Sequence, residues 1–431
     1  MRSLAVLSMH TSPLAQPGTG DGGGMNVYVR ELSTALARAG VECDVFTRAW
    51  GPEAVAVVDV EPGFRVHHVA AGPLEPVRKE ALPALVPAFT DAVGVRLDQL
   101  AARGREVAAI HANYWLSGLA GHRLKHERNI PLVSTFHTLD RVKAEASPEA
   151  LDAAEPARRA EAEAEVIGCS DAVLASCSVE ADQLIELYGA AAERIHIIAP
   201  GVDRAFFAPG DHRQARRAVG FPTDRPLLLF VGRIQPLKGL DVAVAALAEL
   251  VHGGAGSSSY RRLGGGGRVS DAVLAVIGGP SGPQGADEVH RIEELVAELG
   301  LADRVRFLPP QGHEMLSTFY RAADVCVVPS RSESFGLVAL KAAACGVPVV
   351  ASAVGGLTTL VDDGRSGYLV EGRDPLLWAQ RVAGILTDPG LAASMAQTAS
   401  RRAGQYTWTV GGTRLRRLYG DLTARTLVEC S

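Results

Sequence analysis

The chain has 431 residues, which is too long for one ordinary hydrophobic core, so we expect two domains. Hydrophobic residues make up 47% of the chain and charged residues 21%, a balance typical of globular proteins that excludes a disordered or fibrous chain. The formal net charge of −5 argues against a nucleic-acid partner, because nucleic-acid-binding surfaces are basic.

Two further features of the sequence bear on compartment. The first apolar run, Leu4–Met9, is too short for a signal peptide and is better explained as a buried strand, and no apolar stretch approaches the roughly 20 residues that cross a bilayer. The six cysteines form no CxxC pair and show no metal-ligand spacing, a pattern typical of reduced thiols. We therefore expect a cytoplasmic protein without a membrane span, with its thiols at Cys43, Cys169, Cys177, Cys326, Cys345 and Cys430.

In the first half of the chain, short β-branched runs alternate with amphipathic stretches, which indicates a parallel sheet covered by helices. A helix is predicted from Val27 to Ala39, because Leu32 and Leu36 lie one turn apart and Gly40 suits the C-cap. The strands predicted in this half are Leu4–Met9, Val41–Thr47, Val66–Ala70, Val107–His111, Leu132–Phe136 and Ala172–Ser176.

A second α/β series follows Pro200–Gly201, in a linker that contains Pro and Gly. Its first strand, Leu227–Val231, is strongly apolar and is followed by a predicted helix, Leu240–Val251, and then by a Gly/Ser-rich stretch, 253–267, that indicates a flexible surface insertion. We expect two Rossmann-like doubly wound domains, 1–198 and 199–409, and a C-terminal helix in 410–431 whose packing the sequence does not indicate. The other strands predicted in this half are Ala272–Ile277, Val305–Leu308, Val325–Val328 and Val347–Ala351.

The loop His10–Asn26 is the first candidate ligand-binding segment, because ligands of open α/β sheets bind at the carboxyl ends of the strands. Its glycines let the backbone approach a ligand, and the following helix directs its positive N-terminal end there, so phosphate or sugar hydroxyls would both suit it. The alternative is a long flexible surface loop. The loop also holds a GxGxxG pattern at Gly18–Gly23, but His10–Pro17 separate it from the strand, which disfavours a dinucleotide site.

Two loops of the second half carry charged candidates. Arg233 and Lys238 lie between a predicted strand and a helix, where two cations can neutralise a diphosphate and stabilise it as it leaves. Glu333 lies at the mouth of a helix and can accept sugar hydroxyls, although a helix-capping acid explains it as well. His137 closes a strand, as either a structural or a catalytic residue. The sequence has no DxD motif to hold a divalent metal, so Arg233 and Lys238 must substitute for one.

Together these loops resemble the retaining GT-B glycosyltransferases, and the resemblance runs essentially end to end. Within that group the motifs are similar to those of the inositol 3-phosphate glycosyltransferases that begin mycothiol synthesis. The resemblance implies a GT-B architecture with the active site in the cleft between the domains, UDP-N-acetylglucosamine (UDP-GlcNAc) as donor and 1D-myo-inositol 3-phosphate as acceptor. The motifs are Ser8–Pro13, Pro17–Asp21, Gly23–Tyr28, Tyr114–Gly118, Pro200–Asp203 and Gly232–Gly239.

Carried over by position, the resemblance also implies roles for single residues. It implies no cofactor for the chemistry, a possible structural Mg²⁺ near Tyr320, Arg321 and Ala323, and a homodimer. The implied catalytic residues are His137, which would lie against the transferred sugar, Arg233, Lys238 and Glu333. The implied donor-binding residues are Gln16, Pro17, Gly24, Arg233, Lys238, Gln311, Glu333 and Lys341. The implied acceptor-binding residues are His10, Asp21, Gly22, Gly23, Gly24, Met25, Asn26, Lys79, Tyr114, Thr138 and Arg159.

The chain departs from the family pattern at Lys341, where a second Glu would accept hydrogen bonds from the ribose hydroxyls. Lys can donate but not accept, and a lost bond of this kind costs about 1–3 kcal/mol, or about 5- to 150-fold in affinity. Gln311 also replaces a frequent Arg. We expect an active enzyme with weak donor affinity, in which Lys341→Glu lowers the donor KM.

No residue is an obvious covalent nucleophile, and the resemblance implies a front-face displacement in which the leaving phosphate helps to take the acceptor proton. Three alternatives remain open. The same fold could serve a lipid, sugar-phosphate or polysaccharide acceptor. Lys341 could mark a catalytically impaired protein that only binds nucleotide sugars. A nicotinamide oxidoreductase is third, disfavoured by the position of the glycine pattern.

Overall fold

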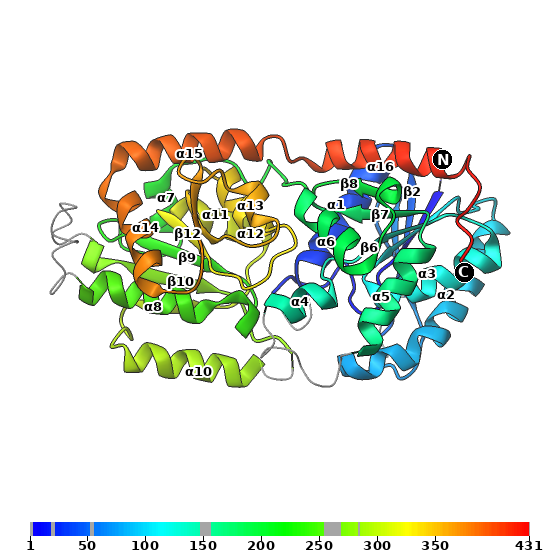
Figure 1. The fold of residues 1–431 in the computed structure, drawn as a ribbon, viewed down its shortest axis with the longest axis horizontal. Helices are drawn as coiled ribbons and strands as arrows, with labels where there is room; N and C mark the ends of the chain where they lie inside the picture. The colour runs from blue at the N-terminus through cyan, green and yellow to red at the C-terminus, as the bar shows by residue number, and fades with distance from the viewer. Residues whose placement is uncertain are drawn as a thin grey trace. The chain divides into compact units, whose positions relative to one another are not determined.

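The computed structural model describes residues 3–18, 22–51, 56–146, 157–253, 269–282 and 285–430, and the chain forms two compact units (Figure 1). Unit 1 comprises Met1–Ala15, Gly24–Gly201 and Trp408–Ser431, and unit 2 comprises Gln16–Gly23 and Val202–Thr407. The chain thus passes between units close to the predicted boundaries at 198 and 409. The glycine loop is divided, because its middle part, Gln16–Gly23, belongs to unit 2.

Unit 1 is built on an eight-stranded sheet in the order β3-β4-β2-β1-β5-β6-β7-β8. All neighbouring strands are parallel except β3, which pairs antiparallel with β4 at the edge. The central strands are buried along their whole length, as their β-branched, apolar sequences predict. The strands are β1 (Ser3–Leu7), β2 (Glu42–Arg48), β3 (Val57–Glu61), β4 (Phe64–Val69), β5 (Ile110–Asn113), β6 (Leu132–Thr135), β7 (Ala172–Ala175) and β8 (Ile195–Ile197).

Helices cover this sheet, and the C-terminal helix α16 (Trp408–Leu422) is one of them. It packs against α1, where a side chain at Gly412 would meet Ala35, and the Tyr419 hydroxyl lies 2.8 Å from Nδ1 of His111 in the sheet. The structure thereby supplies the packing that the sequence leaves open. The other helices are α1 (Gly24–Arg38), α2 (Val86–Ala101), α3 (Trp115–Arg128), α4 (Asp140–Ala146), α5 (Ala157–Cys169) and α6 (Ser178–Tyr188), with 3-10 turns at Lys79–Leu85 and Ala192–Arg194.

Unit 2 is built on a six-stranded parallel sheet in the order β11-β10-β9-β12-β13-β14. Trp378 of α14 is fully buried in its core, and α14 packs against α8 and against strands β12, β13 and β14. The strands are β9 (Leu227–Val231), β10 (Val273–Ile277), β11 (Val305–Leu308), β12 (Val325–Val328), β13 (Val349–Ser352) and β14 (Gly367–Val370). The helices are α7 (His212–Ala218), α8 (Leu240–His252), α10 (Gly285–Glu298), α11 (His313–Ala322), α12 (Leu337–Ala344), α13 (Leu357–Leu360), α14 (Pro375–Thr387) and α15 (Pro389–Ala403), with 3-10 turns at Pro236–Lys238 and Val269–Asp271.

These two sheets confirm the predicted α/β fold of two doubly wound domains. Every predicted strand is present, and three are matched to the residue, whereas the edge strands β3, β8 and β14 were not predicted. The predicted insertion, 253–267, lies almost entirely outside the described residues. Among the described helices, none is long and apolar enough to cross a membrane.

The prediction of six reduced thiols is wrong for one pair. Cys169, at the end of α5, and Cys430, in the C-terminal tail, form a disulfide, with their Cα atoms 5.1 Å apart. The sequence gives no sign of this pair because 261 positions separate the two residues. The other four cysteines are buried and lie outside the disulfide.

Candidate active site

Four of the predicted acceptor residues meet at the aromatic ring of Tyr114 in unit 1. The His10 ring centroid lies 4.4 Å from that of Tyr114, and the two cations Arg159 and Lys79 lie 4.9 and 5.8 Å from it. These residues come from four separate segments, the loop after β1, the 3-10 turn before α2, the end of β5 and α5. The result is a patch with two positive charges at the carboxyl edge of the sheet, which suits an anion.

Tyr114 has an unusual backbone conformation, with φ 75° and ψ 155° at the N-cap of α3. Glycine adopts this region easily, whereas a side chain there costs about 1–3 kcal/mol, and such residues cluster at functional sites. The Tyr114 hydroxyl is buried and has no hydrogen-bond partner among the described residues.

Arg159 is held in place by its own hydrogen bonds. Its side chain is 1% exposed, Nε donates to Glu163 at 2.8 Å, and one terminal nitrogen donates to the carbonyl and hydroxyl oxygens of Thr138 at 2.9 and 3.1 Å. Thr138, another predicted acceptor residue, is thus joined to the patch through Arg159. Glu163 at 2.8 Å and Asp140 at 3.8 Å both neutralise its charge, so Arg159 can remain buried.

His137 follows β6 at the same edge and also has a positive φ, 63°. Its Nε2 lies 2.9 Å from Oδ1 of Asn113, the last residue of β5, and its ring packs edge-on against Tyr28. Burial, aided by the neighbouring His111, lowers the pKa of His137 to about 3, so the imidazole is neutral at physiological pH. A neutral imidazole can exchange hydrogen bonds with a sugar hydroxyl but does not serve as a cationic acid.

Asn113 is the functional candidate that the sequence reasoning missed. It ends β5 one residue before Tyr114, it is 1% exposed, and its Nδ2 has no hydrogen-bond partner among the described residues. The sequence pattern did contain an indication of this role. Asn113 ends β5 and His137 follows β6, and these two parallel strands finish at the same edge of the sheet.

The part of the glycine loop that belongs to unit 1 is rigidly held. Asn26 is 1% exposed, and its Nδ2 donates to the Thr11 hydroxyl and the Ser12 carbonyl, each at 2.6 Å. The Asn26 side chain therefore joins the loop to the start of α1, which is a structural role. Gly24 and Met25 form the first turn of α1, whose positive end suits an anion. Asp21 lies outside the described residues.

In unit 2 the structure joins two predicted donor residues from different loops. Nζ of Lys238 donates to Oε2 of Glu333 at 2.6 Å, with the side chains 24% and 18% exposed, and the Ser330 hydroxyl donates to the same oxygen at 3.2 Å. Lys238 ends the 3-10 turn before α8, and Glu333 lies in the loop between β12 and α12. The cation predicted for phosphate is therefore positioned by the carboxylate predicted for the sugar.

Four other predicted donor residues, Gln16, Pro17, Arg233 and Gln311, also belong to unit 2, as do the predicted acceptor residues Gly22 and Gly23. Arg233 donates to the Ser281 hydroxyl at 3.2 Å, and Gly23 lies against it, since a side chain there would be 3.5 Å from Nε. Gln16, beside Pro17, donates to the Gln311 carbonyl at 3.1 Å. Gly22, the other predicted glycine here, accepts a hydrogen bond from the Gly18 amide at 2.8 Å.

Glycines allow the loops of unit 2 to cross closely. A side chain at Gly239 would lie 2.1 Å from the Pro329 carbonyl, and one at Gly355 would lie 1.9 Å from the Glu333 carbonyl. Both residues also have a positive φ, 67° and 48°. These contacts fix the backbone on both sides of the Lys238–Glu333 pair.

Lys341 points toward an aromatic ring. It is 9% exposed, and its ammonium lies 4.8 Å from the centroid of Phe207, a favourable cation–π geometry. Its predicted place at the ribose hydroxyls is not tested and stays a prediction.

Tyr320, Arg321 and Ala323 fit a magnesium ion poorly. Mg²⁺ prefers an octahedral set of oxygen ligands, mainly carboxylates, water and phosphate. Here Tyr320 is fully buried, Arg321 brings a cation that donates to Phe206 and Ser317, and Ala323 caps α11. The magnesium site stays a prediction without support from these side chains.

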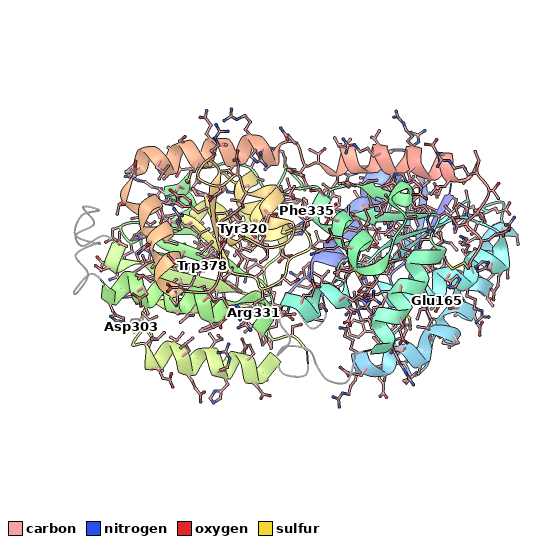
Figure 2. The ribbon with its side chains drawn as sticks, in the orientation of Figure 1. Glu165, Asp303, Tyr320, Arg331, Phe335 and Trp378 are labelled. Carbon is pink, nitrogen blue, oxygen red and sulfur yellow. A yellow bond between two sulfur atoms is a disulfide. The ribbon has the colours of Figure 1, made fainter. Side chains whose placement is uncertain are left out.

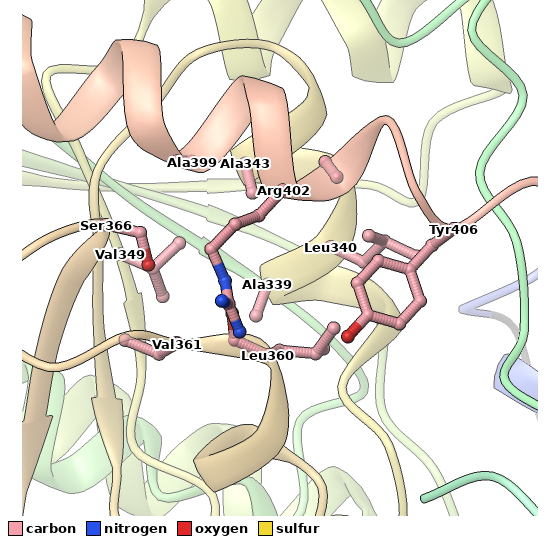
Figure 3. Close-up of a pocket in the computed structure, with 11 residues that line it drawn as sticks. Ala339, Leu340, Ala343, Val349, Leu360, Val361, Ser366, Ala399, Arg402 and Tyr406 are labelled. Atoms are coloured by element: carbon pink, nitrogen blue, oxygen red, sulfur yellow. The ribbon is translucent and has the colours of Figure 1, made fainter.

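Unit 2 also has a small pocket (Figure 3). Arg402 and Tyr406, at and beyond the end of α15, face α12 and α13 across it. None of the predicted donor residues lines it.

Comparison with known proteins shows the class of protein to which this chain belongs. Residues 22–206 match the family described as "Glycosyltransferase Family 4", and residues 211–402 match "Glycosyl transferases group 1". A solved sucrose-phosphate synthase from Thermosynechococcus elongatus is 34% identical, with a TM-score of 0.87 over 98% of this chain and 100% of that chain. WaaG, a glycosyltransferase of lipopolysaccharide biosynthesis, shares the fold at 19% identity, with a TM-score of 0.70 over 97% and 99% of the two chains. The protein is a GT-B glycosyltransferase.

Curated relatives give the family. The D-inositol 3-phosphate glycosyltransferase of Acidothermus cellulolyticus is 46% identical over 407 residues, 94% of this chain and 87% of the relative. D-inositol 3-phosphate glycosyltransferase 2 of Catenulispora acidiphila is 47% identical over 408 residues, 95% of this chain and 92% of the relative. The chain belongs to the D-inositol 3-phosphate glycosyltransferase family.

Proposed function

We propose that the protein transfers N-acetylglucosamine from UDP-GlcNAc to 1D-myo-inositol 3-phosphate with retention of configuration, the first step of mycothiol synthesis. The observation that carries the proposal is the gathering of His10, Lys79 and Arg159 around Tyr114. Two cations and an aromatic ring suit a phosphate ester of a polyol. The names of the relatives support the choice of inositol 3-phosphate.

The acceptor phosphate would bind Lys79 and Arg159. Arg159 is preorganised by Glu163 and Thr138, so little side-chain entropy is lost when the phosphate binds.

The donor diphosphate would bind Arg233 and Lys238. As the sugar–phosphate bond breaks, negative charge grows on the leaving UDP, and these cations stabilise it where it develops. Glu333 holds Lys238 in position and can accept a sugar hydroxyl with its remaining lone pairs. Neutral His137 would hydrogen-bond the transferred sugar. In the front-face displacement, the leaving phosphate oxygen takes the acceptor proton, so no protein base is needed.

The test is an assay of purified enzyme with UDP-GlcNAc and 1D-myo-inositol 3-phosphate, following UDP release with and without acceptor. We expect release that depends on the acceptor, and a product with the α configuration of the donor. Unphosphorylated myo-inositol is the matched control, because it keeps the hydroxyls and removes the charge that Lys79 and Arg159 would bind. Equal rates with both acceptors would contradict the proposal.

A sugar phosphate is the second candidate acceptor. The likeness to a sucrose-phosphate synthase, at 34% identity, favours it, and the same cations would bind any phosphate monoester. Hexose monophosphates in the same assay separate the two, since the better acceptor has the higher kcat/KM.

A homodimer and a structural magnesium ion are proposed from the family resemblance alone, and action in the cytoplasm is proposed from the sequence. Size-exclusion chromatography with light scattering tests the homodimer, and metal analysis after chelation tests the magnesium. No step of the proposed reaction depends on that ion.

A further inference from the structure

Four side chains with metal-binding atoms meet on unit 1, away from the candidate active site. His122 and His126 lie one turn apart on α3, Cys169 ends α5, and Cys430 lies in the C-terminal tail, which Figure 1 shows returning beside α3. One nitrogen or sulfur atom of each lies within 4.8 Å of the corresponding atoms of the others. Within the described part of the chain, this is the one such group of His, Cys, Asp and Glu residues.

The donor set is the one that zinc prefers. Two thiolates and two imidazoles form the usual tetrahedral structural site, and the i, i+4 spacing on α3 puts both rings on one face of the helix. The geometry agrees, because Nε2 of His126 lies 3.0 Å and Nε2 of His122 lies 3.3 Å from Sγ of Cys430. Both imidazoles therefore direct the same nitrogen toward one point.

A neighbouring carboxylate orients one of these imidazoles. Oε1 of Glu165, a residue of α5 labelled in Figure 2, lies 3.1 Å from Nδ1 of His122. When Nδ1 carries the proton, the lone pair of Nε2 faces the cysteines. Metal-bound histidines nearly always have such a partner on the second nitrogen.

The tail is positioned independently of its cysteine. Nζ of Lys125 donates to the Val428 carbonyl at 2.9 Å, and Oδ1 of Asp171 accepts from the Val428 amide at 2.7 Å. Lys125 and Asp171 are buried and also form an ion pair at 3.0 Å. These contacts hold Cys430 over α3 whether or not its sulfur is bonded.

We propose that the reduced protein binds one zinc ion through His122, His126, Cys169 and Cys430, and that the ion fastens the C-terminal tail to α3 and α5. A dithiol reductant supplies the two electrons and two protons that open the Cys169–Cys430 disulfide and becomes a disulfide itself. A phosphine supplies the two electrons and becomes a phosphine oxide, and water supplies the oxygen atom and the two protons. Zinc then replaces the two thiol protons, which pass to solvent. None of the four ligands belongs to the candidate active site, so the site is independent of the proposed glycosyl transfer.

The test uses the full chain without a histidine tag, reduced with a phosphine, stripped of metal with a chelator and titrated with Zn²⁺ against a chromophoric chelator. We expect one zinc per chain in the reduced protein and none in the disulfide form. Cobalt in place of zinc should give thiolate-to-cobalt charge-transfer bands and the intense d–d bands of tetrahedral coordination. Zinc should also raise the apparent Tm of the reduced protein, since it binds only the folded site.

Variants connect the binding to these residues. Cys430→Ser and His126→Ala should each abolish the stoichiometric site, and neither is in the core of the unit. The matched controls, Cys177→Ser and His290→Ala, remove the same residue types elsewhere and should keep one zinc per chain. Glu165→Gln should weaken zinc binding by about 10- to 100-fold without changing the stoichiometry.

Three results would overturn the proposal. The first is a reduced wild-type protein that takes up no zinc while both thiols titrate as accessible, which would leave a disulfide only. The second is unchanged zinc stoichiometry in both ligand variants. The third is equal zinc affinity of the oxidised and reduced proteins, because the sulfurs of a disulfide are not thiolate ligands.

Discussion

Tyr114 and His137 are non-glycine residues with positive φ at the ends of neighbouring strands of unit 1. Each conformation costs about 1–3 kcal/mol and persists only because the surroundings fix it. Tyr114 is packed by His10 and Arg159, and His137 by Asn113 and Tyr28. This conformational cost is expected where two side chains must face one ligand from the ends of two strands.

Lys79 tests the proposed phosphate site. Lys79→Met removes the cation near Tyr114 but keeps most of the apolar stem, so the acceptor KM should rise by about 10- to 150-fold, as for the loss of a hydrogen bond to a charged group. The donor KM should not change. Steady-state kinetics with each substrate varied provides the measurement. Arg78→Met is the control, because Arg78 is the exposed neighbouring cation, and an equal effect there would refute a specific role for Lys79.

Lys341 tests the altered donor site. If the ribose hydroxyls lack an acceptor, Lys341→Glu should lower the donor KM by about 5- to 150-fold. The same change places a carboxylate near the face of Phe207, so the apparent Tm should fall. Kinetics and thermal unfolding measure the two effects separately. An unchanged donor KM would mean that Lys341 does not occupy the ribose site.

At the scale of elements, glycines in the loops of unit 2 fix the positions of its predicted donor residues. The loop before α8 carries Lys238, the loop before α12 carries Glu333, and the loop after β13 carries Gly355. Gly355 has no space for a side chain, because the Glu333 carbonyl would lie 1.9 Å away. The position of Glu333 therefore depends on an element that contributes no side chain to the site.

Gly355→Ala should displace the Glu333 loop and weaken its ion pair with Lys238. We expect kcat/KM for the donor to fall by at least about 10-fold, since one lost hydrogen bond to a charged group has that effect. Gly364→Ala is the matched control: Gly364 also has a positive φ, 71°, but open space around it. If both variants lose the same activity, backbone strain and not the displaced loop is the cause.

At the scale of the whole molecule, buried histidines predict how stability depends on pH. Burial lowers the pKa of His111 and of His137 to about 3, whereas an unfolded histidine titrates near 6.5. Between these values the unfolded chain binds more protons than the folded chain. The contribution of these two histidines to stability is therefore present in full above pH 6.5 and is lost as the pH falls toward 3.

Thermal unfolding between pH 7 and 4 measures this effect. The apparent Tm should fall as the pH decreases, and the slope should be smaller in His111→Gln, because glutamine can still bond the hydroxyls of Thr135 and Tyr419 but does not titrate. His290→Ala, at an exposed position, should keep the wild-type slope. If the apparent Tm of His111→Gln depends on pH as steeply as that of the wild type, other titratable groups dominate the loss of stability at acid pH.

Much of the fold could be predicted because its signals are local. The buried strands of both sheets are β-branched, apolar runs, and Leu227–Val231, Val305–Leu308 and Val325–Val328 were matched to the residue. The edge strands β3, β8 and β14, which are only partly buried, were missed. Their pairing depends on a neighbouring strand more than on their own pattern.

The sequence by itself determined the α/β class, the loops that follow the strands, and the family, because periodicity and motifs are read along the chain. Only the tertiary structure decided which of those loops meet. It brought Lys79 and Arg159 to Tyr114, joined Lys238 to Glu333, and added Asn113 beside His137. It also brought Cys430 to Cys169 and the two histidines of α3. Contacts between residues tens to hundreds of positions apart follow from how helices and strands pack in three dimensions, and no local pattern encodes them.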